Sequence, residues 1–154
     1  MLGVEYPDTL ISMTNLTSTY RNQGRWKEAE ELDVQVMETS KRVLGVEHPD
    51  TLTSMANLAS TYWNQGRWKE AEELEVQVME TSLRVLGEEH PSTLTSMANL
   101  AFTWESQGRD HDALELMKAC HLLRKLKLGA DHPDTVASLE ALNEWESASS
   151  PMNS

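Results

Sequence analysis

The chain has 154 residues and a formal net charge of −12. This charge repels polyanions, which excludes nucleic acid and anionic lipid surfaces as natural partners. A basic protein or peptide is the partner class that such a charge attracts, although an acidic surface also serves solubility alone. The hydrophobic content of 39% is low for one globule and suits a repeat array, whose units bury only the faces that they share.

The cysteine content and the lack of long apolar runs bear on the compartment. The single cysteine, Cys120, lies in an apolar helical stretch, where we expect a small buried residue. One cysteine cannot form an internal disulfide, which fits a reducing compartment. No run is apolar enough to span a bilayer, and the first residues lack the pattern of a signal peptide. We therefore expect a protein of the cytosol or the nucleus, and of these we favour the cytoplasm. We expect no membrane partner.

A repeat organises the chain. One constant spacing, 42 positions, relates four prolines, Pro7, Pro49, Pro91 and Pro133, and it also relates the glycines at 3, 45, 87 and 129. The repeats cover residues 3–44, 45–86 and 87–128, and the first two differ at only seven positions. Because the chain begins at a repeat boundary, we expect it to be a piece of a longer array or the product of a gene with few repeats.

Each repeat is predicted to form two antiparallel helices. In the second repeat the first helix opens at Pro49, carries apolar residues at helical spacing and stops at Gly66. The second helix starts near Arg67 and has one apolar and one acidic face, and Gly87 ends it. Short connections require neighbouring helices to be antiparallel and to pack together.

The fourth repeat is incomplete. Residues 133–146 are predicted to form a capping helix whose inward face carries Val136, Leu139, Leu142 and Trp145. The array therefore spans residues 1–146, and residues 147–154 are expected to be a disordered tail because they have no apolar pattern.

The motif Asn57-Leu58-Ala59-x-x-Tyr62-x-x-x-Gly66-x-Trp68-x-x-Ala71 resembles the signature of the tetratricopeptide repeat. The length of the period, with Leu86-Gly87-x-x-His90-Pro91-x-Thr93-Leu94, is similar to the longer variety found in kinesin light chains. Near-identical tandem copies also resemble the C-terminal arrays of fungal NOD-like (STAND-type) receptors. The resemblance implies an all-α, right-handed superhelical solenoid of about seven helices.

The same resemblance implies a concave surface that binds a protein or peptide. In several such arrays an asparagine of each first helix hydrogen-bonds an extended ligand, and the matching residues are Asn15, Asn57 and Asn99. The fourth repeat departs from this pattern, with Ala141 at the position. Kinesin light chains have a basic groove for acidic peptides, and that ligand class does not carry over to this acidic chain.

Differences between the copies indicate the same surface. Four of the seven differences between the first two repeats, at positions 11, 14, 17 and 21, fall within an arc of about 120° on the first helix. Such a cluster of differences is typical of a recognition surface, although exposed positions also vary freely in sequence. Besides the asparagines, the predicted groove contains Ile11, Ser18, Arg21, Thr53, Ser60, Trp63 and Phe102. Trp63 either anchors a ligand or packs on a helix end, whereas Trp26 and Trp68 are expected in the core.

The remaining candidate sites are set aside. His48, His90 and His132 recur once per repeat at the start of a first helix, too far apart to share a metal. The carboxylates are periodic and solvated, and no phosphate loop or nucleophile motif is present. We expect no cofactor and no enzymatic activity. Two functions remain: a module that binds a protein or peptide in its groove, within a larger signalling protein, and a structural array that self-associates or spaces other domains.

Overall fold

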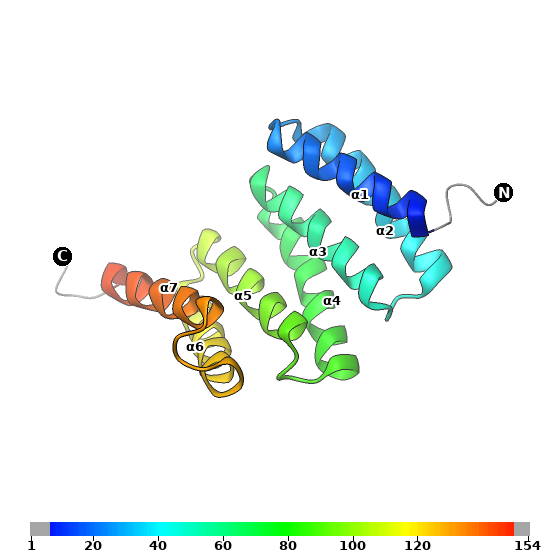
Figure 1. Cartoon of the computed structure of the whole chain (residues 1–154). Coiled ribbons are helices and arrows are strands. Elements are labelled where there is room, and N and C mark those ends of the chain that lie inside the picture. Colours follow the sequence, from blue (N-terminus) through cyan, green and yellow to red (C-terminus); the bar gives the residue numbers. More distant parts are fainter. Residues whose placement is uncertain (1–6, 150–154) are drawn as a thin grey trace. The chain divides into compact units, whose positions relative to one another are not determined.

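The structure, a computed structural model, describes residues 7–149, and these form seven helices joined by short turns (Figure 1). Residues 1–6 and 150–154, with the start of the first predicted repeat and most of the predicted tail, lie outside the described residues. No strand occurs between residues 7 and 149. The all-α class and the seven predicted helices are confirmed. The helices are α1 (Pro7–Asn22), α2 (Trp26–Leu44), α3 (Pro49–Asn64), α4 (Trp68–Leu86), α5 (Pro91–Ser106), α6 (Asp110–Leu128) and α7 (Pro133–Ser149).

Every first helix begins at a proline, and in α3, α5 and α7 a histidine precedes that proline. Proline suits the first helical position because its missing N–H would have no partner there. His48 Nδ1 accepts the backbone N–H of Asp50 at 3.0 Å, and His90 and His132 accept equivalent bonds at 3.1 and 3.0 Å. The recurring histidines therefore cap the helices at whose start the sequence places them.

The turn inside each hairpin depends on a glycine. Gly66 has φ +78°, in the left-handed region that L side chains rarely adopt. This conformation lets the N–H of Arg67 donate to the carbonyl of Tyr62 at 2.9 Å, which closes the end of α3. The Arg67 guanidinium then lies over the Tyr62 ring, 4.4 Å from its centroid. The same arginine-on-aromatic contact recurs at the turns that follow α1 and α5.

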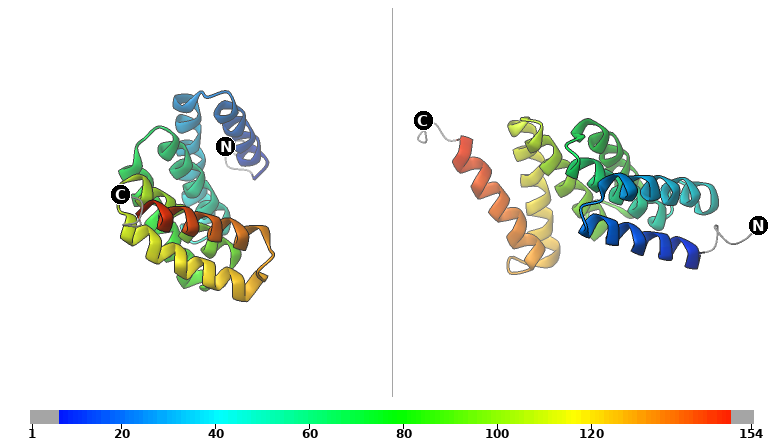
Figure 2. Two further views of the ribbon diagram at one scale, coloured as in Figure 1. Left: turned by 90° about the vertical axis from the view of Figure 1, so that its left-hand side faces the viewer. Right: turned by 90° about the horizontal axis from the view of Figure 1, so that it is seen from above.

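The chain divides into two compact units, residues 1–78 and 79–154, where the sequence predicts one continuous array. In the first unit α2 contacts both α1 and α3, and in the second α6 contacts both α5 and α7 (Figure 2). A shift of two repeats, from Pro7 to Pro91, relates α1, α2 and α3 to α5, α6 and α7. Each unit therefore contains one such set of three helices, and the boundary between the units falls within α4.

Each unit has its own core. In the first, Leu52, Met55 and Val78 are buried together, with Met37 and Leu74 packed against them. In the second, ten residues form the core: Leu94, Met97, Ala98, Ala101, Ala113, Met117, Cys120, Ala141, Leu142 and Trp145. The predicted burial of Cys120 is confirmed.

Three predicted core positions are wrong. Trp68 is 37% exposed because it is the first residue of α4, next to the exposed turn at Gly66, while Trp26 is half-buried. Val136 and Leu139 are 40% and 44% exposed. Their counterparts Leu52 and Met55 pack against the second helix of their repeat, and no such helix follows α7 among the described residues.

Helix α7 continues to Ser149, three residues past the predicted end at 146. Two features favour the longer helix. The sequence has no glycine or proline between Pro133 and Pro151 to stop it. In addition, Trp145 is buried and meets Phe102 of α5 edge-on, with ring centroids 5.3 Å apart, which ties the last turns of α7 to the core.

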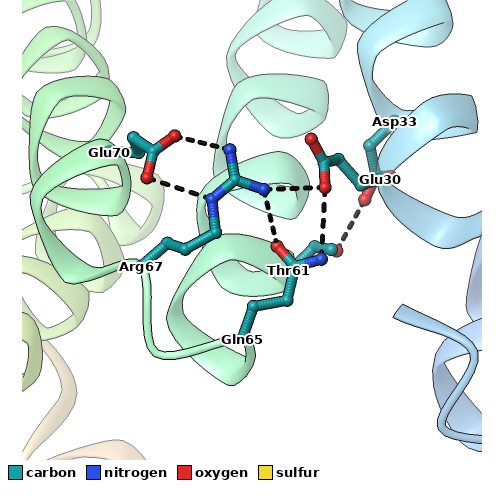
Figure 3. Close-up of polar contacts among 6 residues, drawn as sticks. All are labelled: Glu30, Asp33, Thr61, Gln65, Arg67 and Glu70. Atoms are coloured by element: carbon teal, nitrogen blue, oxygen red, sulfur yellow. Dashed lines mark hydrogen bonds and ion pairs between the residues drawn. The ribbon is translucent and has the colours of Figure 1, made fainter. Parts of the chain in front are cut away.

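Polar contacts fix α3 against α2 (Figure 3). Thr61 Oγ1 donates to Asp33 Oδ2 at 2.6 Å, and both residues are buried. Nearer the surface, Glu30 accepts from Gln65 at 3.1 Å and from Arg67 at 2.8 Å. Arg67 lies in the turn between α3 and α4, and its guanidinium also donates to Glu70 of α4. The guanidinium therefore contacts Glu30 of α2, Tyr62 of α3 and Glu70 of α4, and so links three helices.

Candidate binding groove

The first unit contains a groove of about 450 Å³ bounded by α1, α2 and α3. Its buried wall is apolar, and its rim carries neutral amides and hydroxyls. The lining residues are Leu10, Ile11, Thr14 and Asn15 of α1, Val36, Ser40 and Leu44 of α2, His48 of the loop, and Asp50, Thr53, Ser54 and Asn57 of α3. Leu10 and Val36 are buried, whereas Ile11 is 58% exposed and extends the apolar wall to the surface.

The structure brings four of the predicted groove residues together here. Ile11, Asn15, Thr53 and Asn57 all line the groove. The two asparagines occupy the same position on successive first helices, so the predicted repetition of an amide holds within this unit.

The other predicted residues lie elsewhere. Ser18, Ser60 and Trp63 belong to α1 and α3 but do not line the groove, and Trp63 is 37% exposed. Asn99 is exposed in the second unit, where Phe102 packs against Trp145. Phe102 is therefore part of the contact between α5 and α7 as well as a surface residue.

Arg21 marks one end of the groove. Its Nη1 donates to the backbone carbonyl of Asn57 at 3.3 Å, which joins α1 directly to α3. Arg21 is also close enough to Asp33 to oppose the effect of burial on that carboxyl. Burial raises the pKa of Asp33 above its usual value, while the hydrogen bond from Thr61 and the charge of Arg21 lower it. Asp50 supplies the one carboxylate at the other end of the groove.

Sequence reasoning missed the wall that α2 contributes. Val36, Ser40 and Leu44 lie on a second helix, whereas the resemblance directs attention to first helices only. A signal was nevertheless present in the alignment of the repeats. The position of Ser40 is serine again in the second repeat, at Ser82, and arginine in the third, at Arg124.

Two other classes of site are not found in the part of the chain that the structure describes. Between residues 7 and 149 no three histidine, cysteine, aspartate or glutamate side chains gather closely enough to hold a metal ion. Over the same range no helix has both the length and the apolar character that crossing a membrane requires. Cys120 donates its thiol to the carbonyl of Leu94 at 3.3 Å, and burial raises the pKa of this thiol.

Family models for the tetratricopeptide repeat match residues 8–83 and 93–134. The chain belongs to the tetratricopeptide repeat family. The matches cover all or most of each helix from α1 to α6 and include the cap residues His48 and His132 but not His90. No curated protein sequence matches the chain.

Solved structures agree with this assignment and indicate the type of tetratricopeptide repeat. The crystal structure of nearly identical TPR-like repeats from a candidate kinesin light chain of Podosopora anserina is 34% identical, with a TM-score of 0.85. The match covers 93% of this chain and 68% of that one. A variant of those repeats with one substituted residue is also 34% identical, with a TM-score of 0.81, over 94% and 68% of the two chains.

A third structure shares the fold alone. BtubC (BKLC) from P. vanneervenii is 20% identical, with a TM-score of 0.81 over 93% of this chain and 57% of its own. Together the matches identify the chain as tetratricopeptide repeats of the kinesin-light-chain-like type. Repeats of this family are interaction or scaffold modules that are generally not enzymes, so protein is the partner class that the family implies.

Proposed function

We propose that these tetratricopeptide repeats bind an extended segment of a partner protein in the groove of the first unit. The observation that carries the proposal is the groove itself, which combines an apolar wall with amides from two first helices. Its volume of about 450 Å³ is within the range of binding pockets. This is enough space for a few side chains and not for a folded domain.

The rim suits an extended backbone. An asparagine side chain both donates and accepts, so it can satisfy the N–H and C=O groups that an extended segment leaves unpaired. Asn15 of α1 and Asn57 of α3 present two such amides to the groove, one from each first helix. Affinity would then come from backbone bonds to the amides, and selectivity from the side chains that enter between Leu10, Ile11 and Leu44.

Selection from a displayed random peptide library on the whole chain, followed by fluorescence anisotropy of the selected peptides, tests this function. Asn57→Ala should weaken binding about tenfold, the loss expected for about 1.4 kcal/mol, with the melting temperature unchanged. Asn99→Ala removes the equivalent exposed amide of the second unit and should change the affinity less than about twofold. Equal binding by Asn57→Ala and the unaltered chain would exclude the groove.

We further propose that the chain works inside a larger signalling protein of the cytoplasm. Support comes from the near-identity of the first two repeats, a feature that resembles the arrays of STAND-type receptors. A nucleotide-binding domain encoded upstream would support a receptor, and further repeats alone would favour an adaptor.

A self-associating array is the second candidate function. Leu16 is 43% exposed at α1, although its counterparts Leu58 and Leu100 are buried, and Val136 and Leu139 are exposed at α7. Light scattering over a range of concentrations separates the two functions. A mass that rises with concentration would support association through these faces, and a constant monomer mass would count against it.

A further inference from the structure

The two units allow a direct comparison of the groove with its own counterpart. Shifting the groove residues by two repeats places them on α5, α6 and α7 of the second unit. Many positions keep their residue or their character, such as Leu10 with Leu94, and His48 with His132. The largest change in side-chain size is at Ser40, which corresponds to Arg124.

Arg124 is buried where its side chain crosses the space between α6 and α7. It is only 7% exposed, and its Nη1 donates to the backbone carbonyl of Asp134 at 3.0 Å. The guanidinium is also close enough to the buried Cys120 to influence its pKa, and Cys120 corresponds to Val36 of the groove. A buried arginine side chain therefore fits the three-helix geometry at this position, with its guanidinium on a carbonyl of the last helix.

The first unit has the corresponding three helices but lacks the arginine side chain. Ser40 replaces the arginine, and Asp50, the counterpart of Asp134, lines the groove. None of the twelve residues that line the groove is a lysine or an arginine, and Asp50 is the one carboxylate among them. The groove thus presents an acidic end at Asp50, where the second unit holds its own basic group.

We propose that an arginine side chain of the partner segment occupies the Ser40–Asp50 end of the groove, as Arg124 occupies the equivalent space in the second unit. The inference rests on the proposed function and adds the chemistry of the ligand. The incoming guanidinium donates to the Asp50 carbonyl and carboxylate, and its methylene stem lies against Val36 and Leu44.

Charge around the groove favours this occupant. The chain has a net charge of −12, which attracts a basic segment before contact. His48, the other titratable residue of the lining, uses its Nδ1 to accept the Asp50 N–H. Arg21 donates to the backbone carbonyl of Asn57, a groove residue about two turns along α3 from Asp50. A basic ligand residue is therefore directed to the Asp50 end.

Titration of the whole 15N-labelled chain with N-acetyl-arginine amide tests the inference, with N-acetyl-citrulline amide as the neutral isostere. The expected result is saturable movement of the Ser40, Asp50 and Thr53 amide signals by the arginine compound, with at least tenfold weaker binding of citrulline. Ser40→Arg should abolish the response, since it supplies the side chain that the second unit already accommodates. Ser147→Arg adds the same charge at an exposed position of α7 in the other unit and should retain it.

Equal responses to arginine and citrulline, or an unchanged response in Ser40→Arg, would overturn the assignment. If Ser40→Arg melts at a much lower temperature, Asp50→Asn decides instead, with a loss of at least fivefold in arginine binding expected and no loss contradicting the proposal. Failure of the broader function is distinguishable. Library peptides that need Asn57 but contain no basic residue would leave the binding groove in place and remove the arginine assignment alone.

Discussion

The hydrogen bond between Thr61 and Asp33 shows how one buried contact positions the groove. Thr61 belongs to α3 and Asp33 to α2, so the bond at 2.6 Å fixes two of the three helices that line the groove. Burial raises the pKa of Asp33, and the bond from Thr61 partly offsets that effect because it favours the charged carboxylate. Ionisation of Asp33 thus costs stability as the pH rises through its pKa in the folded state.

Thr61→Val should destabilise the chain by about 1–3 kcal/mol at neutral pH, because a buried carboxylate loses its donor. The pKa of Asp33 would then rise further, so the cost should shrink as the pH falls toward the usual aspartate value of about 4 and the carboxyl becomes protonated. Urea denaturation at the two pH values measures this.

Thr19→Val is the matched control for this measurement. Thr19 occupies the same repeat position in α1, is exposed and donates only to the Asn15 carbonyl of its own helix, at 3.1 Å. Its loss should change the free energy of unfolding by less than about 0.5 kcal/mol. Equal costs for the two variants, or a Thr61→Val cost that does not depend on pH, would refute the role of Asp33.

Individual groove residues were predictable to the extent that they repeat. Asn15 and Asn57 stand out because the same amide returns once per repeat, and both line the groove. Ser40 has no such mark, since a serine on a second helix is unremarkable in sequence. Its importance comes from the contact of α2 with both α1 and α3, which is a property of packing and is invisible in a periodic pattern.

At the scale of the helix, start and stop signals are local and predict the helices well, except that α7 continues three residues past its predicted end. Proline at the first position and a capping histidine before it begin α3, α5 and α7, and a left-handed glycine follows each hairpin turn. What each helix buries is decided by its neighbours instead. For this reason the exposure of Val136 and Leu139 on α7 could not be predicted from their apolar spacing.

The histidine caps give a prediction at this scale. His90→Ala removes the ring nitrogen that accepts the Ser92 N–H at 3.1 Å and should cost about 0.5–2 kcal/mol of stability. His90→Asn keeps a short acceptor at the same position and should cost less than half as much. Chemical denaturation of the three proteins is the measurement, and a His90→Asn variant as unstable as His90→Ala would show that the cap contributes little.

At the scale of the whole molecule, two sets of three helices are related by a shift of two repeats and differ in the residues at their groove positions. Six of the twelve positions that line the groove carry a different residue in the second set, among them Ser40, which corresponds to Arg124, and Asn57, which corresponds to Ala141. The sequence predicts the repeats and the family because each hairpin carries its own signals. It does not predict the division into two compact units, which depends on contacts between helices.

We propose that the partner segment binds in the groove between α1, α2 and α3. The most direct measurement is a map of backbone amide chemical-shift changes over the whole chain when a library-selected peptide is added. Changes should concentrate in residues 10–15, 36–44 and 48–57, which line the groove. A map centred on α5, α6 and α7, or spread over the acidic outer faces of the second helices, would contradict the claim.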